Sequence, residues 1–155
     1  MSAPRTPNLQ EGKLIKEIDF QILMCREKIK NHEKSIAKIK RMAGMNGPSG
    51  IGSVDLSGMP KAGFSHMDFP DAIALIAKDE EYIEQEKAAI KALRKRKRNL
   101  IKAVEILDGT EQNIFIYRVL YGMTQDAAAE AIGVSSRQLQ RIEKQMKENT
   151  KVFEL

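Results

Sequence analysis

A regular apolar seam constrains the fold of this chain more than any other feature. Its positions recur at alternating spacings of three and four residues, and no Pro or Gly occurs between residues 13 and 43. This repeat is typical of a helix that buries one narrow stripe against a partner helix. We therefore predict a helix over about residues 12–43. The seam consists of Ile15, Ile18, Ile22, Cys25, Ile29, His32, Ile36 and Ile39.

A second helix is predicted from Asp71 to about Leu107, after a linker over residues 44–70 that contains six Gly and three Pro. Residues 26–41 hold seven basic and two acidic groups, whereas residues 71–86 hold six acidic groups and one Lys. Because folding back would bring these opposite charges together, we predict an antiparallel coiled-coil hairpin. A parallel dimer through one helix is an open alternative. The stripe expected on the second helix comprises Ile73, Ile76, Ile83, Ile90, Leu93, Ile101 and Val104.

Composition argues against several functional classes. The single cysteine, Cys25, falls in the seam, which indicates a small buried hydrophobe rather than a reactive thiol. No stretch approaches the roughly 20 apolar residues that span a bilayer, and the first residues lack the apolar run of a secretory signal. No catalytic Cys/His or Ser/His/Asp constellation is visible, and His66 has no partners at ligand spacing. We expect no enzyme activity, no cofactor, no metal and no membrane partner.

The segment TQDAAAEAIGVSSRQLQRI, residues 124–142, carries the pattern of two short helices joined by a tight turn. Thr124 is the expected N-cap of the first helix, and Gly133 is expected to end it. Ser135 begins the second helix, with Gln138 three residues later as in a capping box. Small or apolar residues fill the positions that a helix-turn-helix needs for close helix crossing and a shared core. They are Ala128, Ala129, Ile132, Val134, Leu139 and Ile142.

The outer face of the helix over residues 136–148 is predicted to read DNA. Arg137 and Arg141 lie one helical turn apart, so both can enter a major groove and contact guanine, while Gln140 suits adenine. Residues 111–155 carry six basic and six acidic groups, so any electrostatic footprint must be local. The candidate DNA-binding residues are Ser135, Ser136, Arg137, Gln138, Gln140, Arg141 and Lys144. The candidates for DNA-backbone contact are Thr124, Gln125, Lys147, Arg94, Arg96 and Arg98, the last three from the RKRKR run.

The stretch EQNIFIYRVLYGMTQDAAAEAIGVSSRQLQRIEKQM, residues 111–146, resembles the helix-turn-helix of sigma-factor region four. It is most similar in kind to the ArpU-like and RinA-like regulators of phage late genes. That family places a charged helical coil, often with an MPK segment such as residues 59–61, ahead of the motif. The resemblance implies a sequence-specific transcription activator of phage or prophage genes, acting in the cytoplasm of a bacterial host cell. The chain has no recognisable promoter-melting region, so the resemblance does not extend to a complete sigma factor.

The predicted fold class is all-α: a long antiparallel coiled-coil hairpin followed by a C-terminal three-helix helix-turn-helix module. We expect a disordered N-terminus over residues 1–11, the hairpin with its linker over 12–107, the module over 108–150 and a tail over 151–155. Double-stranded DNA is the expected partner, with the coil mediating homodimerisation or contact with RNA polymerase. Two alternatives are open: a small terminase subunit acting in DNA packaging, and a coiled-coil interaction protein whose terminal helices are purely structural.

Overall fold

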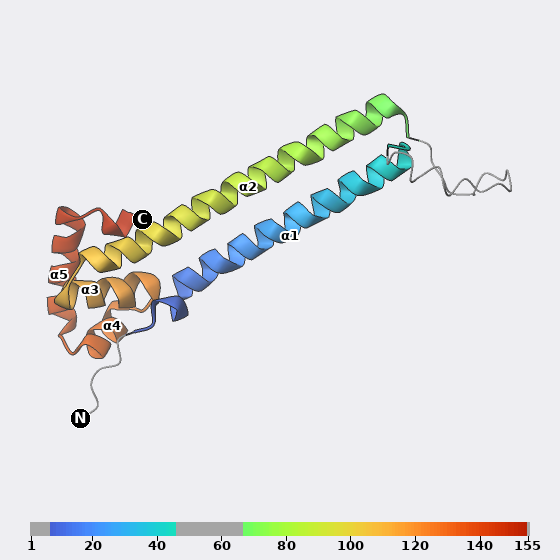
Figure 1. The fold of residues 1–155 in the computed structure, drawn as a ribbon. Helices are drawn as coiled ribbons and strands as arrows, with labels where there is room; N and C mark the ends of the chain where they lie inside the picture. Colours follow the sequence, from blue (N-terminus) through green and yellow to red (C-terminus); the bar gives the residue numbers. More distant parts are fainter. Residues whose placement is uncertain (1–6, 46–66, 155) are drawn as a thin grey trace, which may run out of the picture. The chain divides into compact units, whose positions relative to one another are not determined.

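The computed structural model describes residues 7–45 and 67–154, and the regular elements within these ranges are all helical (Figure 1). Two long helices, α1 (Lys13–Met42) and α2 (Phe69–Ile106), run antiparallel and precede a module of short helices. The chain divides into two compact units. One comprises residues 24–90, and the other combines residues 1–23 with residues 91–155. The all-α hairpin followed by a small helical module is therefore confirmed.

The heptad seam is the buried stripe of α1, which confirms the helix predicted over residues 12–43. In the unit with the C-terminal module, Ile15 and Ile18 are almost completely buried. In the other unit Cys25 and Ile39 are buried, and His32 is half-buried. Burial raises the pKa of the Cys25 thiol, and the nearby Glu86 carboxylate raises it further. Cys25 is thus a buried side chain whose environment disfavours the nucleophilic thiolate.

Opposite charges meet along the hairpin as the sequence predicts. In the unit of residues 24–90, a His32 ring nitrogen lies 2.9 Å from an Asp79 carboxylate oxygen, and the Ser35 hydroxyl donates to the other oxygen at 2.8 Å. Lys28 lies 3.7 Å from Glu86. In the other unit Lys97 pairs with Asp19 at 2.8 Å. Since ion pairs that reach solvent, such as Lys28–Glu86 and Lys97–Asp19, contribute only about 0–1 kcal/mol each, they fix register more than they stabilise the hairpin.

The buried stripe of α2 differs from the predicted one at its start. Ile73 is 47% exposed, whereas its neighbour Ala72 is completely buried and packs with Ile39 and Ile76. The prediction favoured the larger aliphatic side chain, but successive helix positions differ by about 100° and only the Ala72 direction lines up with Ile76 and Ile83. Further along, Leu100 and Ala103 are buried and Ile101 is only partly so.

Several expected boundaries differ from the structure. Residues 9–11, expected to be disordered, form the short helix η1 (Leu9–Glu11), which the Asn8 side chain caps. The expected tail contains η4 (Val152–Glu154), whose Phe153 ring packs edge-on against Phe115 with centroids 6.1 Å apart. Phe69 and Pro70 belong to α2 rather than to the linker, because Pro is tolerated in the first turn of a helix. Residues 46–66, including the MPK segment and His66, lie outside the described residues. No helix among the described residues is long and apolar enough to cross a membrane.

The start of α1 is held against the C-terminal module by a close backbone approach. A Cβ atom added to Gly12 would lie 2.9 Å from the Leu120 carbonyl oxygen, and Gly12 is buried. Nearby, the Tyr121 hydroxyl donates to the Asn8 carbonyl oxygen at 2.7 Å. The N-terminal segment before α1 is therefore part of the packing that supports this module.

Replacing Gly12 by Ala should lower the free energy of unfolding by about 1–3 kcal/mol, because the new methyl group meets backbone rather than a movable side chain. Urea unfolding followed by circular dichroism measures this loss. Gly44→Ala is the comparison without a clash: apart from its chain neighbours, no atom of the described residues lies within 4 Å of the added Cβ, so any loss of stability there comes from its φ of +68° alone. A Gly12→Ala variant as stable as the parent would show that the contact relaxes freely.

Candidate nucleic-acid interface

The first helix of the C-terminal module changes its hydrogen-bonding pattern part-way along. α3 (Gly109–Phe115) continues into the π-helical segment η3 (Ile116–Leu120), where the Tyr121 N–H donates to the Ile116 carbonyl at 2.9 Å. Phe115 and Leu120 are completely buried. Shortly after the segment, Gly122 adopts a φ of +67°, a left-handed backbone conformation that favours glycine.

The next helix, α4 (Gln125–Ile132), is short because both of its ends are specified locally. The Thr124 hydroxyl accepts from the Ala127 N–H at 3.3 Å. At the other end Gly133 adopts a left-handed φ of +86°, and the Val134 N–H donates to the Ala129 carbonyl at 3.0 Å. That bond closes the turn in the manner of a Schellman motif. Ala128 and Ala129 are buried, so small side chains allow the close helix packing that was predicted.

The predicted recognition helix is α5 (Ser136–Asn149), and its buried stripe includes Leu139 and Met146. The Ser135 hydroxyl accepts from the Gln138 N–H at 3.2 Å, which confirms the N-cap. The reciprocal half of the capping box does not form, because the Gln138 side chain is exposed and makes no hydrogen bond within the described ranges. Gln138 is consequently available for other contacts.

A buried carboxylate joins the three helices of the module, and sequence reasoning missed it. Glu143 on α5 is only 3% exposed, and Arg118 on η3 approaches both of its oxygens at 3.4 Å. Gln125 on α4 donates to one oxygen at 3.2 Å, and Lys147 lies 3.6 Å from the other. Arg118 also donates to the Met123 carbonyl in the segment before α4. These contacts fix α5 relative to both preceding helices.

The Glu143 cluster makes the stability of the module depend on pH. Burial by itself raises the pKa of Glu143, but hydrogen bonds from Arg118 and Gln125, with the charges of Arg118 and Lys147, lower it below its ordinary value of 4.5. The unfolded chain then binds a proton more readily than the folded one. The stabilisation is complete above about pH 4.5 and is lost as the pH falls from there through the lower folded-state pKa.

Unfolding free energies measured in urea should therefore decrease from pH 6 to pH 3, and this decrease should be shallower in Glu143→Leu than in the parent. Asp79, whose pKa is also lowered despite its burial, adds to the slope equally in both proteins. Identical slopes for the two proteins would exclude Glu143 as a source of the pH dependence.

Of the seven candidate DNA-binding residues, three have side chains that bond within the domain and four do not. Two of them are tied to α4: the Ser136 hydroxyl donates to Asp126 at 2.7 Å, and the Gln140 amide donates to the Gln125 carbonyl oxygen at 3.2 Å. Ser135 is occupied as the N-cap. The side chains of the remaining four are exposed and make no hydrogen bond or ion pair with any described residue: Arg137, Gln138, Arg141 and Lys144.

The six candidates for backbone contact are less uniform than the sequence suggested. Thr124 is exposed and caps α4. Gln125 is half-buried, and its side-chain amide is hydrogen-bonded to both Glu143 and Gln140. Lys147 pairs with Glu143 and lies 5.4 Å from the centre of the Phe153 ring. All three arginines of the basic run, Arg94, Arg96 and Arg98, are exposed on α2 in the same compact unit as the module.

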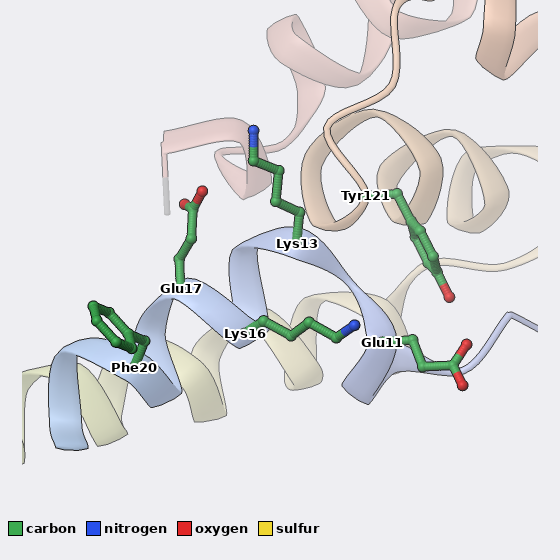
Figure 2. A pocket seen from close by; sticks show the side chains of 6 residues that line it. All are labelled: Glu11, Lys13, Lys16, Glu17, Phe20 and Tyr121. Atoms are coloured by element: carbon green, nitrogen blue, oxygen red, sulfur yellow. The ribbon is translucent and has the colours of Figure 1, made fainter.

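An open hollow of about 510 Å³ lies beside the start of α1 (Figure 2). It is lined by Glu11, Lys13, Lys16, Glu17, Phe20 and Tyr121. Burial, and the nearby Glu11 charge, raise the pKa of Tyr121, so its hydroxyl is protonated and available to donate to the Asn8 carbonyl. None of the predicted DNA-reading residues lines this hollow. The interface that the sequence predicts is instead the exposed face of α5.

Comparison with known families bears on the same segment. Residues 114–150 match the HTH_3 family model, described as helix-turn-helix. The chain carries a helix-turn-helix DNA-binding domain near its C-terminus. The matched residues run from the end of α3 to the C-cap of α5 and therefore include Arg118, the Gly133 turn and Glu143. Searches of curated proteins and of solved structures gave no match.

Proposed function

We propose that this chain is a sequence-specific transcriptional regulator of phage or prophage genes, and that α5 of its helix-turn-helix domain reads the major groove. The observation that carries the proposal is the pair Arg137 and Arg141. Both are exposed on α5, one helical turn apart, and make no ion pair with any described residue. Guanidinium groups so placed can each bind a guanine edge in bidentate fashion.

The alternative of a purely structural helical corner explains the packing of α4 against α5, but not the charged side chains on the exposed face of α5. Such a corner needs the buried Ala129 and Leu139, and the turn at Gly133 that joins the two helices. It places no demand on the solvent side of α5. There, positive groups without a partner among the described residues stand on a domain with no excess of basic residues. A local cationic surface of this kind favours a nucleic-acid ligand.

We further propose that the coil mediates either homodimerisation or contact with RNA polymerase. One helix-turn-helix reads only a short half-site, and dimers gain affinity by binding two half-sites about one helical turn apart. The long hairpin of α1 and α2 offers the additional surface for such pairing. The resemblance of residues 111–146 to ArpU-like and RinA-like regulators supports the role of activator.

A small terminase subunit is the second candidate, because the same combination of a helix-turn-helix domain with a long helical hairpin would serve DNA packaging. Oligomeric state distinguishes the two. We expect light scattering of the full chain to give a dimer or a monomer for a regulator, whereas a ring of many subunits would favour the terminase. A coiled-coil interaction protein would show no specific DNA binding in any oligomeric state.

The first experiment is a gel-shift titration with DNA flanking the chain's own gene. A regulator should bind one fragment with a dissociation constant of about 10⁻⁸ M or lower at physiological salt, and other fragments roughly 10³-fold more weakly. Uniform weak binding to all fragments, with steep salt dependence, would indicate a backbone binder and overturn the proposal of sequence-specific regulation.

A further inference from the structure

We propose that Gln125 is a positioning residue that fixes the side-chain amide of Gln140, so that α5 presents this amide to an adenine edge in one orientation. This inference rests on the proposed function, because it assigns a specific role to one contact of the DNA-reading surface. It concerns a chain of hydrogen bonds that starts at the buried Glu143 carboxylate and ends at the exposed face of α5.

The Glu143 carboxyl group at the start of this chain of hydrogen bonds is negatively charged. Its pKa is lowered by Arg118 and Gln125 despite its burial, so the carboxylate is ionised at neutral pH. An ionised carboxylate only accepts hydrogen bonds. Because Glu143 is 3% exposed and is held on both oxygens by Arg118, it has no freedom to turn toward water.

The second step is the orientation of Gln125. Its Nε2 donates a hydrogen bond to a Glu143 carboxylate oxygen at 3.2 Å, and this is the only possible direction because an ionised carboxylate has no proton to donate. The reverse orientation would place the Gln125 carbonyl oxygen against a buried negative charge. The Gln125 Oε1 therefore faces away from Glu143, and it accepts a hydrogen bond from Gln140 Nε2 at 3.2 Å.

The Gln140 side chain keeps part of its hydrogen-bonding capacity free for DNA. One of its amide hydrogens is bonded to Gln125, which leaves its carbonyl oxygen and its second amide hydrogen for other partners. The major-groove edge of adenine offers the complementary pair, an N6 donor beside an N7 acceptor. Guanine offers two acceptors there, so the fixed carbonyl oxygen would oppose another oxygen. Restraint before binding also reduces the entropy that is lost when the contact forms.

Gln125→Met tests the relay in the full-length chain, because Met has similar length and helix propensity but cannot bridge two polar groups. The probes are a duplex selected by the parent protein and versions of it with single base pairs exchanged. We expect discrimination for one A·T pair to fall on the order of tenfold, with affinity for unrelated DNA unchanged. Gln140→Met should lose preference at the same base pair, and the double variant should lose little more than either single variant.

Gln145→Met is the matched control, since the Gln145 side chain is exposed on α5 and makes no hydrogen bond with a described residue. Undiminished discrimination in a folded Gln125→Met variant would overturn the relay. An equal fall in affinity for all sequences would also overturn it, by indicating phosphate contact instead. If Gln125→Met does not fold, Gln125→Asn, which is too short to bridge both partners, provides the same comparison. A parent protein without preference at any base pair would instead refute the proposed function itself.

Discussion

Arg118→Met should lower the free energy of unfolding by about 3–5 kcal/mol at pH 7. The variant leaves Glu143, a side chain only 4% exposed, without its main cationic partner. Gln125 and Lys147 remain, but neither replaces the guanidinium that contacts both carboxylate oxygens. Urea unfolding followed by circular dichroism gives the difference directly.

Two further variants make this result specific to the ion pair. Arg26→Met, at an exposed α1 position without a partner among the described residues, should change stability by less than about 0.5 kcal/mol. The double variant Arg118→Met with Glu143→Leu should regain most of the lost stability, because apolar replacement of both partners removes the unpaired charge. A single Arg118→Met variant within about 1 kcal/mol of the parent would contradict the importance assigned to the cluster.

The second large effect concerns affinity for DNA rather than stability. Replacing Arg137 and Arg141 together by Ala should cost about 1–3 kcal/mol of binding free energy per guanidinium, which weakens specific binding by at least roughly thirtyfold. Both side chains are exposed and have no partner in the part of the chain that the structure describes, so the double variant should unfold at the same urea concentration as the parent. Fluorescence anisotropy with a labelled specific duplex measures the loss.

Arg26→Ala serves here as the control for loss of positive charge, because it removes an exposed guanidinium from the unit that does not contain the helix-turn-helix domain. It should leave specific binding nearly unchanged. A folded Arg137→Ala and Arg141→Ala double variant that binds as tightly as the parent would exclude α5 as the reading helix.

The elements of this fold could be predicted because their signals are local in the sequence. The heptad seam that begins at Ile15 defines α1 without reference to any other segment. In the helix-turn-helix domain, the Ser135 cap and the Gly133 turn each involve residues within a few positions. Even the pairing of α1 with α2 follows from a charge gradient that extends over many residues.

The contacts that tune the candidate site depend on distant partners and were not predictable in the same way. In the sequence, Glu143 resembles any other charged residue of an exposed helix. Its burial depends on the ion pair with Arg118, which lies 25 residues earlier. One local signal was present, since Glu143 follows the buried Leu139 by four residues and precedes Met146 by three. Gln140 offers no such signal, because only the fold brings Gln125 to it.

The contacts at the start of α1 also join residues that are distant in the sequence. Asn8 and Tyr121 are 113 residues apart in the sequence, and no spacing rule connects them. The Leu120 carbonyl excludes a side chain at position 12 for a reason that is purely spatial. These contacts make the segment before α1 a structural part of the unit that contains the helix-turn-helix domain. Dividing the sequence into consecutive domains would assign the two to different domains.

Selection of bound duplexes from a random DNA pool, followed by titration of the selected duplex and a shuffled version of equal length, tests the central claim most directly. At physiological salt we expect the selected duplex to bind roughly 10³-fold or more tightly than the shuffled one. We also expect the Arg137→Ala and Arg141→Ala double variant to lose most of that ratio. Equal affinity of the parent for both duplexes would contradict the account that this chain reads DNA sequence through α5.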